Sequence, residues 1–289
     1  MQLVIPTIAP FSFAQTLAFS CRFAPLETAA IVEADRLVAA FAHGGRGWSC
    51  ELRERDHQLV VTLADDAPRS LADRMAALVG ARDDLRPFYA LAEQDRVMRD
   101  VIRNLHGLHQ VRFLGLEEIA VYCVMMQRTP IRTAAAYTQR FLARFGHPVE
   151  HDGRTLRAMP ELGELAALDA DTIADAIGHR PKAERIATVV RAVHALGEPF
   201  LVTAPYAAAR DALLEIPGIG PFSAGAILLR GLGRVDEVPS FEMFEEPGRA
   251  IYGAGWQPER IARRYGATIG TWAFYLKTAA GRGMVASRA

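Results

Sequence analysis

A glycine-rich turn between two helical segments, at residues 213–226, constrains the fold of this chain more than any other stretch. The segment reads Leu-Leu-Glu-Ile-Pro-Gly-Ile-Gly-Pro-Phe-Ser-Ala-Gly-Ala. Gly218 and Gly220 permit the backbone angles of a sharp turn, and Pro221 suits the first turn of a new helix, where a missing N–H breaks no hydrogen bond. The sequence therefore predicts two helices joined by a tight turn, with Ile219 packed into their junction.

The same turn predicts a site for a phosphate group. The first N–H groups of a helix have no partner within the helix and lie at the positive end of its dipole, which favours an anion. A Pro-Gly-Ile-Gly turn followed by small residues is the helix-hairpin-helix signature, which binds the DNA backbone without reading the bases. The alternative is an ordinary helical corner. The expected DNA-binding residues of the turn are Pro217, Gly218, Ile219, Gly220, Phe222 and Ser223.

Composition limits the other possibilities. The chain has 289 residues, 51% of them hydrophobic, which suits about two folded domains. Lys and Arg total 33 and so do Asp and Glu, so no bulk positive charge announces nucleic acid. Only Lys182 and Lys277 are lysines. The three cysteines form no Cys-x-x-Cys pair, which excludes an iron–sulfur cluster or a four-cysteine zinc site.

The N-terminal sequence predicts where the protein works. It has no basic region followed by a long apolar run, so we expect no signal peptide, no membrane partner and a cytoplasmic protein that associates with the nucleoid when bound to DNA. We also expect a monomer that needs no cofactor.

The periodicity of hydrophobic residues divides the chain in two. Short segments rich in β-branched and aromatic residues, at 15–24, 30–41, 47–54 and 58–64, predict an antiparallel sheet, and a helix follows near residues 68–80. From about residue 87 the period is helical throughout. We expect a mainly α protein, with a small α+β domain over residues 1–86 and a larger, all-helical, two-lobed domain over residues 87–289.

From about residue 84 onward the chain resembles the helix-hairpin-helix DNA glycosylases. Its N-terminal sheet is similar to the extra domain of the bacterial 3-methyladenine DNA glycosylases of type II. The resemblance implies a base-excision-repair enzyme that binds duplex DNA, flips out a damaged nucleotide and hydrolyses its N-glycosidic bond; alkylated purines are the expected substrates. The stretches that carry the resemblance, besides the hairpin, are 84–89 with Asp95, 107–108, 117–127, 145–146, 177–183 and 229–231.

The chain departs from the family at the catalytic position. The family places an aspartate two residues after a proline that follows the hairpin, and Phe241 occupies that position here, after Pro239. A carboxylate is needed to stabilise the developing sugar cation, so the next residue, Glu242, becomes the candidate catalytic residue. Alternatively, Glu242 belongs to a solvated acidic helix face at residues 242–246.

Two further family positions bear on mechanism and DNA binding. Members that also cut the backbone carry a lysine two residues after the Gly-x-Gly turn; Phe222 occupies that position, so we expect no lyase activity. The family's lesion-side loop corresponds to Gln127 and Arg128, which we expect to bind DNA, with Arg128 filling the gap left by the flipped base. Alternatively, Arg128 is an ordinary surface residue.

The base pocket of the family has aromatic walls, because alkylated purines can be cationic and a π face attracts a cation. Tyr122, Phe241, Trp272 and Tyr275 are the candidates, with Trp272 and Tyr275, three residues apart on the last helix, as the first choice. Each aromatic residue alone is otherwise a core residue. The resemblance also implies a structural ion at the backbone carbonyls of Ile216 and Ile219, held only when DNA is bound.

Three functions remain open on sequence alone. The first is a monofunctional DNA glycosylase for alkylated purines. The second is a non-catalytic DNA-binding or damage-recognition protein that has lost the catalytic aspartate. The third is a glycosylase for an uncharged base, such as a deaminated base in a mismatch.

Overall fold

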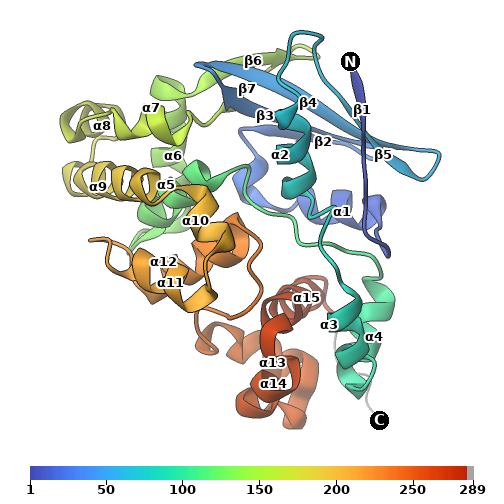
Figure 1. Cartoon of the computed structure of the whole chain (residues 1–289). Helices are drawn as coiled ribbons and strands as arrows, with labels where there is room; N and C mark the ends of the chain where they lie inside the picture. Colours follow the sequence, from blue (N-terminus) through green and yellow to red (C-terminus); the bar gives the residue numbers. More distant parts are fainter. Residues whose placement is uncertain (285–289) are drawn as a thin grey trace.

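The computed structural model describes residues 1–284, in which an antiparallel sheet lies above two groups of helices (Figure 1). The sheet has the strand order β1-β5-β4-β3-β2, and every neighbouring pair is antiparallel. The strands are β1 (Gln2–Ile5), β2 (Ala30–Val32), β3 (Arg36–His43), β4 (Arg46–Arg55) and β5 (Gln58–Thr62).

Both faces of strand β3, which lies between β4 and β2, are buried. Leu37, Ala39 and Phe41 pack with helix α2 (Ser70–Leu78) in one core, and the alternate residues of β3 face a hairpin of β6 (His147–His151) and β7 (Arg154–Ala158) in another. The prediction that everything after residue 87 is helical missed this hairpin, because Pro148 and the alternating residues around it form a pair too short to stand out from the helical pattern.

One predicted strand is wrong. Residues 15–24 were expected in the sheet, but helix α1 covers Phe13–Ser20. The side-chain oxygen of Ser12 accepts the N–H of Gln15 at 3.3 Å and so caps the helix. Phe13 and Leu17, four residues apart, are its buried face. The edge strand that was missed, β1, lies at the N-terminus instead.

The remaining helices confirm the mainly α fold class. They are α3 (Arg86–Ala92), α4 (Arg96–Asn104), α5 (Leu116–Met126), α6 (Ile131–Phe145), α7 (Leu162–Ala166), α8 (Ala170–Ile177), α9 (Arg180–Leu196), α10 (Glu198–Thr203), α11 (Tyr206–Leu214), α12 (Pro221–Ala226), α13 (Glu245–Tyr252), α14 (Pro258–Tyr265) and α15 (Ile269–Gly281). A π-helical turn at Ile227–Gly231 extends α12. Short 3₁₀ turns span Ala24–Leu26, Glu242–Phe244, Gly253–Gly255 and Gly266–Thr268.

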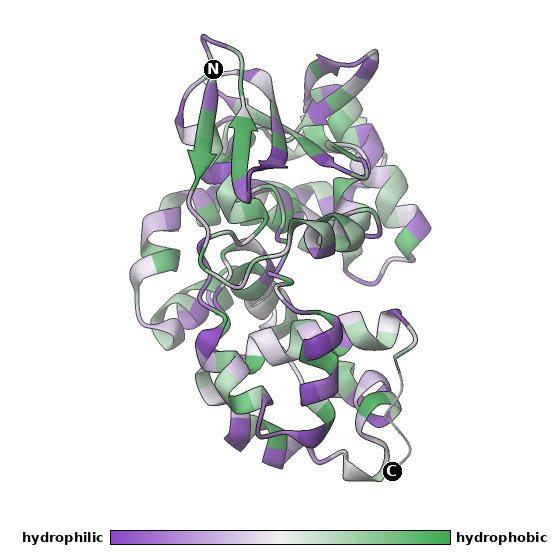
Figure 2. Cartoon of the chain, turned by 90° about the vertical axis from the view of Figure 1, so that its right-hand side faces the viewer, coloured by the Kyte–Doolittle hydropathy of each residue, from purple (hydrophilic) through white to green (hydrophobic). Residues whose placement is uncertain are grey.

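The helices form two lobes with separate cores. The core around α5 and α9 extends to α12, whereas α3 and α4 share a core with α13, α14 and α15 from the far end of the sequence. In Figure 2 hydrophobic residues concentrate where these elements pack together, and the lobe with α13–α15 lies at the bottom. The lower lobe thus consists of α3 and α4 together with α13–α15, and the chain forms the upper lobe, with α5, α9 and α12, between these two groups of helices.

The lower lobe is organised around a buried carboxylate. Asp95 is 3% exposed and accepts two backbone N–H groups of the first turn of α4, at 3.1 and 3.3 Å. Its other oxygen accepts the hydroxyls of Tyr252 and Tyr265, each at 3.0 Å, and Arg264 pairs with it at 3.0 Å. Asp95 therefore both caps α4 and cross-links it to α13 and α14.

We expect Asp95→Ala to lower the free energy of unfolding by ~3–5 kcal/mol, because it leaves a partly buried guanidinium and two buried hydroxyls without their shared acceptor. Urea unfolding followed by circular dichroism measures the change. Asp100→Ala on the exposed side of the same helix is the control, with an expected change within about 0.5 kcal/mol. Equal effects of the two substitutions would contradict this role for Asp95.

Candidate nucleic-acid interface

The glycine turn joins α11 to α12 as the sequence predicts, and its two glycines have different reasons to be there. Gly218 has φ +100°, and a Cβ atom there would lie 2.6 Å from the Cγ atom of Arg185. Gly220 has an extended backbone, with φ −99°, and no atom of the chain lies within 4 Å of the position of its Cβ. The fold therefore requires Gly218, whereas the space over Gly220 is free for a ligand.

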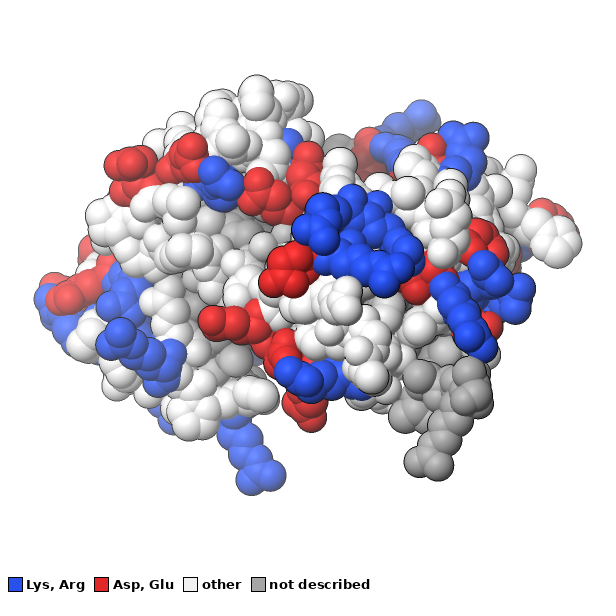
Figure 3. Space-filling view, turned by 90° about the horizontal axis from the view of Figure 1, so that it is seen from below, with Lys and Arg blue, Asp and Glu red and all other residues white. Residues whose placement is uncertain are grey.

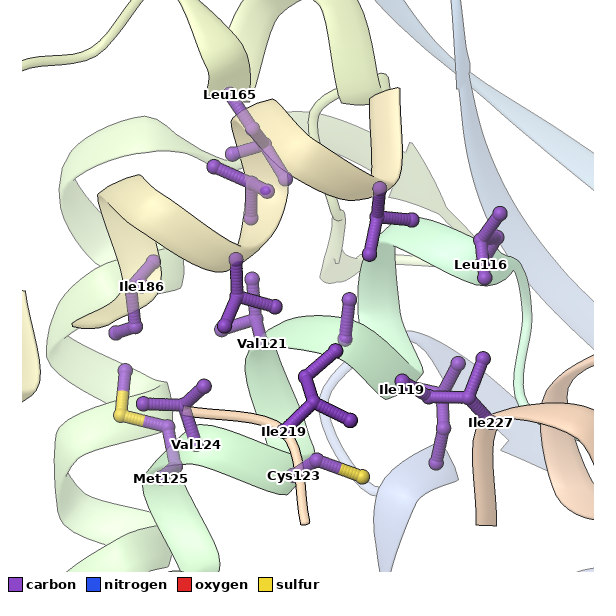
Figure 4. Close-up of a cluster of buried hydrophobic side chains, with 14 of the residues drawn as sticks. Leu116, Ile119, Val121, Cys123, Val124, Met125, Leu165, Ile186, Ile219 and Ile227 are labelled. Atoms are coloured by element: carbon purple, nitrogen blue, oxygen red, sulfur yellow. The ribbon is translucent and has the colours of Figure 1, made fainter. Parts of the chain in front are cut away.

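The turn is anchored on the upper lobe by its central side chain. Ile219 is 7% exposed and packs among residues of α5, including Cys123 and Val124, as Figure 4 shows. Ser223 is also buried, at 5% exposure, whereas Phe222 is 56% exposed. The prediction that Ile219 fills the junction is thus matched by the packing, and Ser223 has little surface with which to contact DNA.

The loop after α5 is tied to the turn by hydrogen bonds. The side-chain Nε2 of Gln127 donates to the backbone carbonyl of Gly218 at 2.7 Å. A guanidinium nitrogen of Arg185 donates to the side-chain Oε1 of Gln127 at 3.0 Å. Lys182 Nζ donates to the carbonyls of Val124 and Gln127, at 3.0 and 2.9 Å. Burial, and then the charge of Arg185, lowers the pKa of Lys182. Gln127 therefore positions the loop against the hairpin.

A groove with a volume of about 810 Å³ runs along this assembly. It brings together residues 217–223 with Gln127 and Arg128, which include the residues expected from the sequence to bind DNA; that they bind DNA stays a prediction. Arg128 is exposed and has φ +49°, a backbone conformation that is uncommon for a side chain of its size. From α9 the groove is lined by Pro181, Glu184, Arg185 and Thr188.

Beside the groove lies a cavity of about 390 Å³ with mostly apolar walls. Phe222 lines both the groove and the cavity. Of the aromatic residues expected at the pocket, only Tyr122 lines it. The walls come from α5, from α12 (the hairpin helix) with its π-helical extension, from α15, from the turn after Pro239, from the segment between α4 and α5, and from the N-terminal part of the chain around α1 (the N-terminal unit). The lining side chains include Phe19, Phe23, Gln110, Phe113, Tyr122, Phe222, Arg230, Met243, Phe244, Phe274 and Lys277.

Trp272 and Tyr275 do not line this cavity, contrary to expectation. Both are 0% exposed in the core of the lower lobe; Trp272 donates its indole N–H to the hydroxyl of Tyr252 at 2.9 Å, and the hydroxyl of Tyr275 donates to the carbonyl of Leu108 at 2.8 Å. Phe241 packs against Trp272 and also lies outside the cavity wall. Because successive helical residues differ by about 100° in direction, the neighbouring stripe of α15 faces the cavity instead.

The residues of this neighbouring stripe were not among those expected at the pocket. Ala273, Phe274, Lys277 and Thr278 of α15 line the cavity. The scarcity of lysine was the one signal that could have singled out Lys277. Nothing in the sequence pattern could have indicated that Phe19 and Phe23, from the N-terminal unit, reach the same wall.

No carboxylate lines the cavity among residues 1–284. Glu242 is exposed at the start of a 3₁₀ turn, whereas the next two residues, Met243 and Phe244, are part of the wall. The candidate catalytic residue is therefore next to the cavity in sequence but not in its wall.

The surface seen from below carries both basic and acidic groups, with uncharged surface between them (Figure 3).

The charged residues of the cavity wall are basic. Burial lowers the pKa of Arg230 to about 10, so its guanidinium stays charged at neutral pH. Lys277 is exposed on one side, and burial of the rest of the side chain, followed by the charge of Arg230, lowers its pKa. One helical turn before Tyr122, burial raises the pKa of Glu118 to about 8, although its carboxyl accepts the N–H of Leu114 at 2.8 Å.

The expected ion site at the hairpin carbonyls stays a prediction. The carbonyl of Ile216 already accepts the N–H of Ile219 at 3.0 Å within the turn. Within residues 1–284, no group of three or more His, Cys, Asp or Glu residues is placed to hold a metal ion. No helix in this part of the chain is long and apolar enough to cross a membrane.

Comparison with curated proteins finds DNA-repair relatives. The chain is 29% identical over 183 residues to the "probable bifunctional transcriptional activator/DNA repair enzyme AlkA" of Mycobacterium tuberculosis, a match of 57% of this chain and 36% of that protein. It is 28% identical over 152 residues to the "DNA-3-methyladenine glycosylase" of Bacillus subtilis, covering 52% of this chain and 50% of that one. The chain thus spans half or less of the length of these relatives. No protein-family model matches the chain.

Comparison with solved structures extends the resemblance over the whole fold. The 3-methyladenine DNA glycosylase of Archaeoglobus fulgidus superposes with a TM-score of 0.78 at 18% identity, covering 97% of this chain and 98% of that one. These findings confirm the resemblance expected from the sequence. The chain has the fold of the helix-hairpin-helix DNA glycosylases, including the N-terminal sheet.

The raised pKa of Glu118 predicts a pH dependence of stability. Between the ordinary pKa of a glutamate and about pH 8, the folded state keeps a proton that the unfolded chain releases, so stability falls as pH rises. We expect Glu118→Gln, which keeps the acceptor for Leu114, to raise the free energy of unfolding by on the order of 3 kcal/mol more at about pH 8 than at about pH 5. Urea unfolding at the two pH values measures this. The exposed control Glu259→Gln should show no such difference, and a pH-independent effect of Glu118→Gln would contradict the protonated carboxyl.

Proposed function

We propose that this chain is a monofunctional DNA glycosylase that grips duplex DNA with its hairpin and takes a flipped-out damaged base into the adjoining cavity. The observation that carries the proposal is the continuity of the two sites. Phe222 lines both the hairpin groove and the apolar cavity, so a backbone held at the turn places its nucleotide at the cavity mouth.

The hairpin supports the DNA-binding part of this proposal. The free space over Gly220 lets a phosphate approach the first N–H groups of α12. Arg128 and Arg185 line the same groove and supply positive charge near the backbone. The relatives support the repair part, because their names include a DNA repair enzyme and a DNA-3-methyladenine glycosylase.

Base release needs a group that stabilises the sugar cation or activates water. Glu242 is our candidate, because it begins the turn whose next two residues line the cavity. Its role requires that this exposed turn moves on DNA binding and brings the carboxylate to the cavity mouth. Phe222 stands where lyase-active members carry lysine, so we propose base release without strand cleavage; trapping of a protein–DNA adduct with borohydride would contradict it.

A second function is favoured by one specific observation. Because no Asp or Glu of residues 1–284 lines the cavity, the chain would also suit a damage-recognition protein that binds an extruded base without releasing it. Base release separates the two functions. Tight binding to lesion-containing duplexes with no release, where a control glycosylase releases the base, would favour the binder.

The free space over Gly220 allows a clean test of DNA binding. Gly220→Asn adds a side chain where no atom of the chain interferes, and asparagine is a good N-cap, so stability should not fall. We expect the affinity for duplex DNA, measured by fluorescence anisotropy, to fall about tenfold through loss of backbone contacts. Gly281→Asn, also in open space but far along α15, is the matched control. Unchanged affinity of Gly220→Asn would exclude the hairpin as the DNA grip.

The catalytic assignment is tested separately. We expect Glu242→Gln to lower the rate of base release from damaged duplexes by about 100-fold, the scale of losing one electrostatic contact to a transition state, with duplex affinity unchanged. Single-turnover assays of base release measure the rate. Glu246→Gln, exposed and nearby, should release bases at the wild-type rate. Wild-type rates in both variants would remove Glu242 from the mechanism.

A further inference from the structure

The charges and unpaired polar groups of the cavity indicate which bases it accepts. Resting on the proposed function, we propose that the cavity selects uncharged bases that present a cyclic-amide edge and excludes bases made cationic by alkylation. Hypoxanthine, the deaminated form of adenine, is an example of the first class. Purines methylated at a ring nitrogen are examples of the second.

Two cations line the cavity and no anion balances them. Arg230 lies in the π-helical turn that extends α12, and Lys277 lies on α15. No Asp or Glu of residues 1–284 lines the cavity with them. After burial, the charge of Arg230 is the next cause that lowers the pKa of Lys277, and the charge of Arg112 contributes to lowering the pKa of Arg230. A cationic base would therefore enter a site that is already positive, with no counter-charge to offset the repulsion.

Several aromatic rings of the cavity wall already face the protein's own cations. The guanidinium carbon of Arg230 lies 4.8 Å from the ring centre of Phe23 and 5.6 Å from that of Phe274. The Nζ atom of Lys277 lies 5.1 Å from the ring centre of Phe244. These contacts use the cation–π capacity of Phe23, Phe274 and Phe244. Phe113, Tyr122 and Phe222 of the same wall have no such contact within residues 1–284, and their rings are left for stacking with a base.

Gln110 provides the complementary hydrogen-bonding groups. This side chain is 4% exposed and lines the cavity, yet neither its amide nitrogen nor its amide oxygen has a hydrogen-bond partner among residues 1–284. The Nε atom of Arg230 is buried and unpaired as well, although its other end donates to the carbonyl of Val111 at 3.0 Å. Unpaired buried polar groups are unfavourable unless a ligand completes them.

The unpaired groups define the edge of the base that fits. An amide side chain has a donor and an acceptor side by side, which match the carbonyl and the N–H of a cyclic amide. Arg230 Nε adds a second donor for the carbonyl oxygen. Adenine methylated at a ring nitrogen lacks this edge and carries the positive charge, so it fails on both counts.

The test compares three duplexes that differ only at one pair: hypoxanthine, 7-methylguanine or adenine, each opposite thymine. A 2′-fluoro group on the sugar of the variable purine prevents base release. At about pH 6, 7-methylguanine is cationic but keeps the cyclic-amide edge, so it isolates the effect of charge. We expect the wild-type chain to bind the hypoxanthine duplex about tenfold more tightly than the adenine duplex, and 7-methylguanine no more tightly than adenine.

Variants assign the selection to residues. Lys277→Met should tighten 7-methylguanine binding about threefold relative to hypoxanthine, and Lys277→Arg, which keeps the charge, should behave as wild type. Gln110→Met should weaken hypoxanthine binding about fivefold without lowering the melting temperature, because it removes an unpaired buried amide. Arg260, an exposed residue of α14 outside the cavity wall, provides the control: Arg260→Met should change the affinities for all three duplexes by one common factor, as expected for a general charge effect.

Preference for 7-methylguanine over hypoxanthine, unaltered by Lys277→Met, would overturn the inference and leave the proposed function standing. Equal binding of all three duplexes would also overturn it. In that case the proposed function is judged separately, by base release and by the effect of Gly220→Asn on duplex affinity. A loss of melting temperature in Gln110→Met would assign that side chain a structural role and would likewise contradict the proposal.

Discussion

The attachment of the hairpin turn to helix α5 is the interaction on which the candidate site depends. Ile219 enters the core of the upper lobe, and Gln127 at the end of α5 donates to the carbonyl of Gly218. Lys182 holds the same helix end by donating to the backbone carbonyls of Val124 and Gln127. Because α5 also supplies one wall of the cavity through Tyr122, the turn and the cavity are held by one rigid element.

Close backbone packing sets the position of the second wall. A Cβ atom at Gly225 would lie 2.8 Å from Pro239, and one at Gly231 would lie 2.7 Å from Ile119. Because neither glycine has a Cβ atom, α12 and its π-helical extension approach the turn at Pro239 and helix α5 more closely than any other residue type at these two positions would allow. Beyond Pro239, Met243 and Phe244 line the cavity, whereas Glu242 is exposed.

The parts that the sequence predicts are those set by local chemistry. The hairpin follows from the backbone freedom of glycine and the fixed φ of proline, and the helical lobes follow from residue spacing. The helix at Phe13–Ser20 was mistaken for a strand, because its cap at Ser12 is a weak signal beside a run of aromatic residues. The hairpin of β6 and β7 was missed, since it is stabilised by packing against β3, a long-range contact.

The site residues show the same limit. Residues 217–223 of the groove are consecutive, so the local turn alone brings them together, whereas Gln127, Arg128 and the residues of α9 join them through the fold. The cavity is assembled from segments far apart in sequence, so which stripe of α15 faces it depends on how the two lobes pack. Trp272 and Tyr275 looked like a pocket wall by composition, whereas the tertiary arrangement places Lys277 there.

The N-terminal unit completes the cavity as well as covering the helical lobes. Phe19, at the end of α1, and Phe23 just beyond it lie against Arg230 and form part of the wall. Substitutions in this N-terminal part of the chain would therefore change the shape of the cavity even if the sequence of every later helix stayed the same. Substitutions at these two positions can thus alter the cavity without changing any residue of the hairpin turn.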